Sequence, residues 1–266
     1  MALFDIKLFS TSLLTNTDVR VVVPTPDEPF HPDATPYYQP GKKYQVLYLL
    51  HGAFGDCTVW TRNTGIERYA QQHKLIVVSA SVTNSCYMDM AHGSRFMTYM
   101  TKELPAFINA MFPVSTRRED TFIAGLSMGG YGAFYLGLSR PDLYSAAASL
   151  SGAVDIGFRV TPLQLPAGAP LPFFAEDCFG DITKVAYSDR DVMELYLRAT
   201  EKGVELPRLY QSCGTKDYLF GMNKIFYTKM TELGAKIQWK EVEGFEHEWN
   251  FWDQEIQYLL NSWLKE

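Results

Sequence analysis

Short, continuous runs of apolar residues recur along most of the chain, and longer segments with apolar residues at helical spacing separate them. Such runs are typical of strands buried on both faces of a parallel sheet, and the intervening segments are typical of helices that cover those faces. The pattern predicts strands at residues 45–50, 75–81, 121–124, 146–150, 208–213 and 237–242. It predicts helices at residues 65–73, 98–111, 128–139, 189–202, 221–233 and 250–264. The alternation indicates an α/β fold with a mostly parallel central sheet.

Two segments depart from this alternation. Residues 5–10 alternate polar and apolar, and residues 19–23 are β-branched and end at a proline, so both are predicted strands of an N-terminal antiparallel part. Residues 153–187 are rich in proline and glycine and interrupt the strand and helix pattern. Long insertions of this kind usually form lids or binding loops. We therefore expect a single domain, residues 1–266, with a small cap at about residues 153–187.

Composition and charge narrow the class of protein. The 24 Lys and Arg against 30 Asp and Glu give a net charge of −6, which argues against nucleic-acid binding. No apolar stretch approaches the roughly 20 residues that a bilayer span needs, so no membrane span is expected. Residues 1–7 lack the basic and apolar parts of a signal peptide, and the four cysteines form no Cys-x-x-Cys pair. We expect a cytoplasmic protein without a metal or cofactor.

The strongest chemical signal is the sequence Gly125-Leu-Ser127-Met-Gly129, which follows a predicted strand and opens a predicted helix. In this G-x-S-x-G pattern a serine sits on a sharp turn between strand and helix, and only small residues fit on either side of it. The turn presents the hydroxyl at the carboxyl end of the sheet, beside a helix N-terminus. Ser127 is therefore the predicted nucleophile.

A serine nucleophile needs a histidine base and an acid that orients it, in the chain order Ser, Asp or Glu, His. Asp217 lies just past the strand at residues 208–213, and His247 follows the strand at residues 237–242. Both positions fall at the same sheet edge as Ser127, so the three side chains are predicted to meet. Asp189 and Asp191 are alternatives for the acid, but they precede a helix and are typical of N-terminal caps.

An oxyanion hole needs two backbone N–H donors, one from the residue after the nucleophile and one from an earlier loop. Met128 is the predicted first donor. The segment His51-Gly-Ala53-Phe54-Gly follows the strand at residues 45–50, and Ala53 is the predicted second donor, with Phe54 as the alternative. His51 is expected to brace this loop rather than to ionise.

With these segments in place, the chain resembles the esterase D branch of the α/β-hydrolases, in particular bacterial tributyrin esterase-like and feruloyl esterase-like proteins. The resemblance rests on Leu47-Tyr-Leu-Leu-His-Gly, the following Trp60, Phe122-Ile-Ala-Gly-Leu-Ser-Met-Gly-Gly-Tyr-Gly, Cys213-Gly-Thr-Lys-Asp and His247-Glu-Trp. It implies an α/β-hydrolase fold and acyl-enzyme chemistry. The group includes short-chain carboxylesterases, hydroxycinnamoyl esterases, S-formylglutathione hydrolases and, more distantly, mycolyl transferases, so the substrate stays open.

The substrate pocket is the least determined part of the prediction. The chain departs from the tributyrin esterase pattern at Ser85 and Cys86, where relatives often carry glycine and tryptophan. Phe-rich positions in the cap, Phe158, Leu163, Leu165, Phe173 and Phe174, are expected to select substrates by shape. The predicted pocket residues are Phe54, Trp60, Cys86, Tyr87, Phe173 and Phe174.

The sequence therefore predicts a serine carboxylesterase that acts on small short-chain acyl esters, with acetyl or hydroxycinnamoyl esters of plant carbohydrates as further candidates. A thioesterase of the S-formylglutathione hydrolase kind is an alternative, and a catalytically inactive binding protein with the same fold is another. A homo-oligomer is expected only because such assemblies are common.

Overall fold

One eight-stranded sheet forms the centre of the molecule, and its strand order is β1-β2-β4-β3-β5-β6-β7-β8. The computed structural model describes residues 1–26, 37–161 and 175–265. Strand β1 pairs antiparallel with β2, β2 pairs antiparallel with β4, and all remaining pairs are parallel. The strands are β1 Ala2–Ser10, β2 Thr15–Val23, β3 Val46–Leu50, β4 Ile76–Ala80, β5 Thr121–Leu126, β6 Ala146–Leu150, β7 Arg208–Gly214 and β8 Ile237–Val242.

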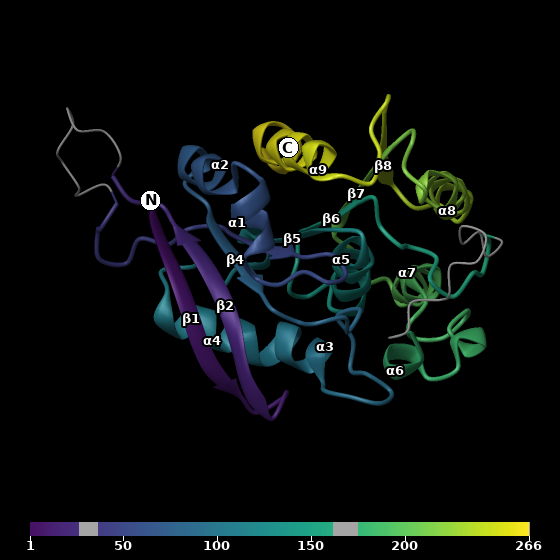
Figure 1. Cartoon of the computed structure of the whole chain (residues 1–266), viewed down its shortest axis with the longest axis horizontal. Coiled ribbons are helices and arrows are strands. Elements are labelled where there is room, and N and C mark those ends of the chain that lie inside the picture. The colour runs from purple at the N-terminus through teal and green to yellow at the C-terminus, as the bar shows by residue number, and fades with distance from the viewer. Residues whose placement is uncertain (27–36, 162–174, 266) are drawn as a thin grey trace.

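Helices cover both faces of this sheet (Figure 1). They are α1 Val59–Asn63, α2 Ile66–His73, α3 Phe96–Thr98, α4 Leu104–Met111, α5 Met128–Ser139, α6 Ala175–Phe179, α7 Val192–Glu201, α8 Phe220–Glu232 and α9 Trp249–Asn261. Helices α1, α2 and α9 contribute to one buried cluster, and α4, α5, α7 and α8 contribute to the other. No helix among the described residues is long and apolar enough to cross a membrane.

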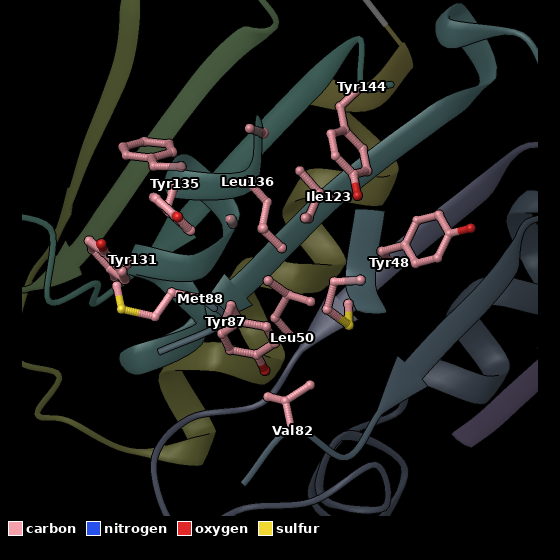
Figure 2. Close-up of a cluster of buried hydrophobic side chains, with 14 of the residues drawn as sticks. Tyr48, Leu50, Val82, Tyr87, Met88, Ile123, Tyr131, Tyr135, Leu136 and Tyr144 are labelled. Atoms are coloured by element: carbon pink, nitrogen blue, oxygen red, sulfur yellow. The ribbon is translucent and has the colours of Figure 1, made fainter. Parts of the chain in front are cut away.

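The continuous apolar strands of the sequence supply both clusters at once because their side chains alternate between the two faces. In β3, Tyr48 lies in the cluster under α4 and α5, whereas its neighbour Leu49 lies in the cluster under α2 and α9. Figure 2 shows part of the first cluster, where Tyr48 and Leu50 of β3 lie near Ile123 of β5. The predicted α/β architecture with a mostly parallel sheet is confirmed.

The structure differs from the predicted elements mainly at their ends. Strands β1 and β2 are longer than predicted because their backbones stay paired along the whole hairpin: residues 2–4 pair with residues 21–23, and residues 15–18 pair with residues 7–10. The predicted helix at residues 98–111 contains a π-helical turn, Tyr99–Glu103, between α3 and α4. The predicted insertion between β6 and α7 carries the short helix α6, and its residues 162–174 lie outside the described residues.

Glu103, at the end of that π-helical turn, fastens the β1–β2 hairpin to the body of the protein. Its carboxylate accepts hydrogen bonds from the Ser10 hydroxyl (2.8 Å) and from the backbone N–H groups of Thr11 (2.8 Å) and Ser12 (2.9 Å). Burial alone would raise the pKa of Glu103, but the hydrogen bonds outweigh this effect and lower the pKa to about 2.

This lowered pKa makes the attachment of the hairpin dependent on pH. Because the folded pKa lies below the ordinary value of 4.5, Glu103 stabilises the fold above that value and loses its contribution as pH falls toward about 2. Glu103→Gln is expected to lower the free energy of unfolding by about 1 kcal/mol at neutral pH, since the carboxylate is partly solvent-screened. Thermal melts across this pH range should show the difference disappear in acid. An equal difference at every pH, or a similar profile for the surface control Glu232→Gln, would contradict the assignment.

Candidate active site

Ser127 occupies the sharp turn between β5 and α5, as the G-x-S-x-G pattern predicts. Its backbone has φ 53° and ψ −117°, a strained conformation for a residue with a side chain. A Cβ atom on Gly125 would lie 2.3 Å from the Gly129 carbonyl oxygen, and one on Gly129 would lie 2.6 Å from the His51 carbonyl oxygen. Both positions therefore exclude any side chain, which explains the two glycines of the pattern.

Asp217 and His247 are hydrogen-bonded to each other. The Nδ1–H group of His247 donates to Oδ2 of Asp217 over 2.8 Å. The Asp217 side chain is fully buried, and its other oxygen, Oδ1, accepts the backbone N–H of Leu219 over 2.8 Å. With Nδ1 protonated for this bond, Nε2 of the neutral imidazole is left as a proton acceptor.

Two backbone hydrogen bonds hold the loops of this acid and base together. The Thr215 N–H donates to the Val242 carbonyl oxygen (3.0 Å), and the Lys216 N–H donates to the Phe245 carbonyl oxygen (2.9 Å). These loops follow the parallel neighbours β7 and β8, and Ser127 follows β5 in the same sheet. Because carboxyl ends of parallel strands share one edge, all three residues lie at that edge of the sheet.

The two predicted oxyanion donors are the backbone N–H groups of Met128 and Ala53. Within the described part of the chain, neither Met128 nor Ala53 donates its amide hydrogen to a protein acceptor. A Cβ atom built on Gly52 would lie 3.4 Å from the Cβ atom of Ser127, so the loop that carries Ala53 lies beside the serine. The Phe54 N–H instead donates to Oδ1 of Asn84 (2.7 Å). This bond favours Ala53 over Phe54 as the second donor.

The family of the chain follows from comparison with known proteins. Residues 30–260 match the model of the family described as "Putative esterase". The chain belongs to this esterase family.

Similar proteins of known structure or activity agree with this membership and confirm the α/β-hydrolase fold. An acetyl esterase of Caldicellulosiruptor saccharolyticus is 29% identical over 98% of this chain and 97% of its own length. The substrate-bound structure of a fluorophosphonate-binding serine hydrolase from Staphylococcus aureus is 29% identical, with a TM-score of 0.85, covering 100% of this chain and 98% of the other. The S-formylglutathione hydrolase of the same organism is 29% identical, with a TM-score of 0.83, covering 100% and 99%. This chain is thus a carboxylic ester hydrolase of the serine type.

His51 braces the loop that carries Ala53 in this esterase. It is fully buried, its Nδ1–H donates to the Gly52 carbonyl oxygen (2.7 Å), and its Nε2 accepts the Val82 N–H (3.1 Å). Burial lowers the pKa of His51, so the ring stays neutral and can make both bonds at once. Asp191, an alternative for the acid, caps α7 by accepting the N–H groups of Met193 and Glu194.

Three of the predicted pocket residues lie inside the core, and the prediction for them is wrong. Trp60 is 1% exposed, and its indole N–H donates to the Leu50 carbonyl oxygen over 2.9 Å. Cys86 and Tyr87 are 0% exposed, and the Tyr87 hydroxyl donates to the His51 carbonyl oxygen over 2.9 Å. These side chains support the loops of the esterase site from behind and offer no surface to a substrate.

The other three predicted pocket residues are Phe54, Phe173 and Phe174. Phe54 lies next to Ala53 and is 78% exposed, and its place in the pocket stays a prediction. Phe173 and Phe174, together with Leu163 and Leu165 of the predicted cap, lie outside the described residues.

Two residues of the esterase site escaped the sequence analysis. Asn84, which holds the Phe54 amide, lies in an irregular loop where no pattern marks a single asparagine. Tyr218 follows Asp217, and its ring lies 4.6 Å from the His247 ring between centroids. On another side of the same imidazole, Trp252 of α9 makes an edge contact at 4.9 Å and 87°. An aromatic residue directly after the acid is the one sequence feature that could have indicated this contact.

Removal of the Tyr218 ring is expected to loosen His247. An aromatic contact of this kind contributes roughly 0.5 to 1.5 kcal/mol, so Tyr218→Leu should lower kcat about three- to tenfold with little change in KM. Tyr218→Phe keeps the ring and should stay near wild type. Steady-state hydrolysis of one chromogenic ester by the three proteins measures this effect. Equal loss in both variants would assign the effect to the hydroxyl instead.

Proposed function

We propose that this esterase hydrolyses short-chain acyl esters of small alcohols through an acyl-enzyme on Ser127, with His247 as base and Asp217 as the orienting acid. The observation that carries the proposal is the bond between His247 Nδ1 and the buried Asp217 carboxylate. That bond fixes the tautomer in which Nε2 accepts a proton, which is the protonation state that a general base needs.

The first half of the proposed reaction forms the acyl-enzyme. Oγ of Ser127 attacks the ester carbonyl carbon while Nε2 of His247 takes the hydroxyl proton. The carbonyl oxygen becomes an oxyanion, which the N–H groups of Met128 and Ala53 stabilise. When the intermediate collapses, the alcohol leaves with the proton from Nε2.

The second half releases the acid. A water molecule gives a proton to Nε2 of His247 and attacks the acyl carbon. The second oxyanion uses the same two N–H donors and collapses to expel Oγ of Ser127, which recovers the proton. Asp217 stays ionised throughout and stabilises the imidazolium that forms in each half.

Two observations support a small acyl group and a cytoplasmic location. The acetyl esterase relative, similar over nearly its whole length, favours a small acyl group. The four cysteines are all buried and free of disulfides, which fits a reducing cytoplasm. In a single domain of this architecture, the insertion at about residues 153–187 would act as a cap over the site.

A thioesterase acting on S-formylglutathione is the second candidate function. The observation in its favour is the similarity to the Staphylococcus aureus enzyme of that activity. Ester and thioester hydrolysis use the same acyl-enzyme steps, so the site geometry fits both.

A panel of substrates separates these candidates. We expect kcat/KM to be highest for p-nitrophenyl acetate or butyrate and at least about tenfold lower for the octanoate, because a small acyl pocket excludes longer chains. Methyl ferulate and S-formylglutathione complete the panel. A maximum at S-formylglutathione would replace the ester proposal with the thioesterase, and a maximum at methyl ferulate would indicate a hydroxycinnamoyl esterase. Activity on none of them would contradict both candidate functions.

A further inference from the structure

Strand β1 is the outermost strand at one end of the sheet, and its outer backbone edge is open (Figure 1). It runs for nine residues, Ala2–Ser10, and every one of them pairs with β2 on the inner side. No described residue hydrogen-bonds to the backbone on the outer side. A long open edge of this kind is a template for pairing with another strand.

The side chains of β1 are unusually apolar for an exposed edge. Leu3 is 40% exposed, Phe4 44% and Phe9 59%. Two charged side chains interrupt them on the face that carries Leu3 and Phe9, Asp5 at 65% exposed and Lys7 at 69%. A partner strand must match this arrangement of apolar and charged side chains.

A second copy of β1 matches it residue for residue. When two copies run antiparallel with Ile6 facing Ile6 of the other copy, the facing residues have numbers that sum to twelve. On one face, Asp5 then lies opposite Lys7 and Leu3 lies opposite Phe9, each pair occurring twice by symmetry. On the other face, Phe4 lies opposite Leu8. Facing pairs of this kind, apolar with apolar and opposite charge with opposite charge, stabilise a sheet.

The charged row extends beyond the two edge strands. Within one chain, Asp5 of β1 already pairs with Arg20 of β2 (2.6 Å), and Lys7 pairs with Asp18 (3.4 Å). Across the proposed contact the row would read Arg20, Asp5, Lys7, Asp18, with the last two from the second copy. The signs alternate along the whole row, so no like charges are neighbours.

Other registers and the other edge lack this match. Moving the register so that Asp5 faces Asp5, or so that Lys7 faces Lys7, places like charges together and pairs fewer residues. At the far end of the sheet, β8 offers Ile237–Val242, where the corresponding registers put Lys240 against Lys240 or Ile237 against Glu241. The complementarity is specific to β1.

We propose that two copies of this chain form a two-fold symmetric dimer in which their β1 strands pair antiparallel about Ile6, joining the two sheets into one. A two-fold axis through the sheet makes the contact self-complementary, as closed dimers require. The sheet edge with Asp217 and His247 belongs to β7 and β8, at the opposite end of the strand order. Each subunit therefore keeps its own complete active site.

Two double variants test the register with equal disturbance of the chain. Leu3→Lys with Phe9→Glu places a lysine opposite a glutamate twice, whereas Leu3→Lys with Phe9→Lys places like charges opposite each other. All these side chains are exposed in the single chain, so both variants should fold. Sedimentation velocity from about 1 to 100 µM is expected to show a dimer for wild type and for the Lys/Glu variant. The Lys/Lys variant should be a monomer, with a dissociation constant raised at least about tenfold.

A matched control and a fold check complete the design. Leu14→Lys changes a residue that is 78% exposed in the turn after β1, beyond the paired residues, and should dimerise like wild type. Unchanged melting temperature and ester hydrolysis show that every variant is folded. A wild-type monomer at all concentrations, or a Lys/Lys variant that still dimerises, would overturn the proposal. A Lys/Glu variant that is as monomeric as the Lys/Lys variant would overturn the register.

Discussion

Replacing Ser127 with alanine is expected to lower kcat about 10⁶-fold, which corresponds to about 8 kcal/mol of barrier. The loss is this large because the nucleophile and its base act as one unit, and the remaining oxyanion donors provide only a fraction of the rate. Hydrolysis of p-nitrophenyl acetate by the purified variant measures the effect. Residual activity above about one hundredth of wild type would assign the nucleophile to another residue.

A second serine-to-alanine variant on the same helix controls for altered folding. Ser139 is the last residue of α5, the helix that begins directly after Ser127. Ser139→Ala should keep wild-type activity, and both variants should melt near the wild-type temperature. A Ser127→Ala protein that melts far lower would show that the lost rate reflects damage to the turn.

Replacing Asp217 with asparagine is expected to lower kcat about 10⁴-fold while the fold is kept, as the equivalent change does in serine proteases. The carboxylate accepts the Nδ1–H of His247 over 2.8 Å, but an amide nitrogen in its place donates a hydrogen instead. The imidazole would then carry its proton on Nε2 and could no longer accept the serine proton. Single-turnover acylation of wild type and variant by the same ester isolates this step.

Asp191→Asn provides the matched control for the acid. Asp191 is also buried, precedes a helix and is, with Asp189, one of the two alternative acids that the sequence offers. Asparagine caps a helix about as well as aspartate, so this variant should retain kcat within a few-fold of wild type. If Asp191→Asn lost activity and Asp217→Asn kept it, the two assignments would have to be exchanged.

Local sequence patterns predicted the parts of this molecule that depend on local rules. The buried strands follow from continuous apolar runs such as residues 46–50, because a strand covered on both faces needs apolar side chains in both directions. The turn at Ser127 follows from Gly125 and Gly129, since only glycine fits where the backbones approach this closely. The positions of Asp217 and His247 follow from their places just after strands of one parallel sheet.

The burial of individual side chains could not be predicted from the sequence. Trp60 and Tyr87 follow the strands whose loops surround the site, and their aromatic side chains suggested a pocket. Whether such a ring faces a cavity or the core depends on where distant helices pack. Trp60 packs edge-on against Trp249 of α9, nearly two hundred positions along the chain, and no local pattern contains that contact. The role of Asn84 is equally hidden from local patterns, because its partner is the backbone N–H of Phe54, thirty positions away.

Asn84 has a consequence for how the enzyme distinguishes leaving groups. Its side-chain oxygen Oδ1 accepts the Phe54 N–H, and its backbone carbonyl oxygen accepts the thiol hydrogen of Cys178 in α6 over 3.0 Å. One residue thus connects the loop of the proposed oxyanion donor Ala53 to the insertion after β6. An alcohol portion that displaces α6 would also displace this donor, which acts only once negative charge develops on the carbonyl oxygen. We therefore expect discrimination between alcohols to change kcat as well as KM.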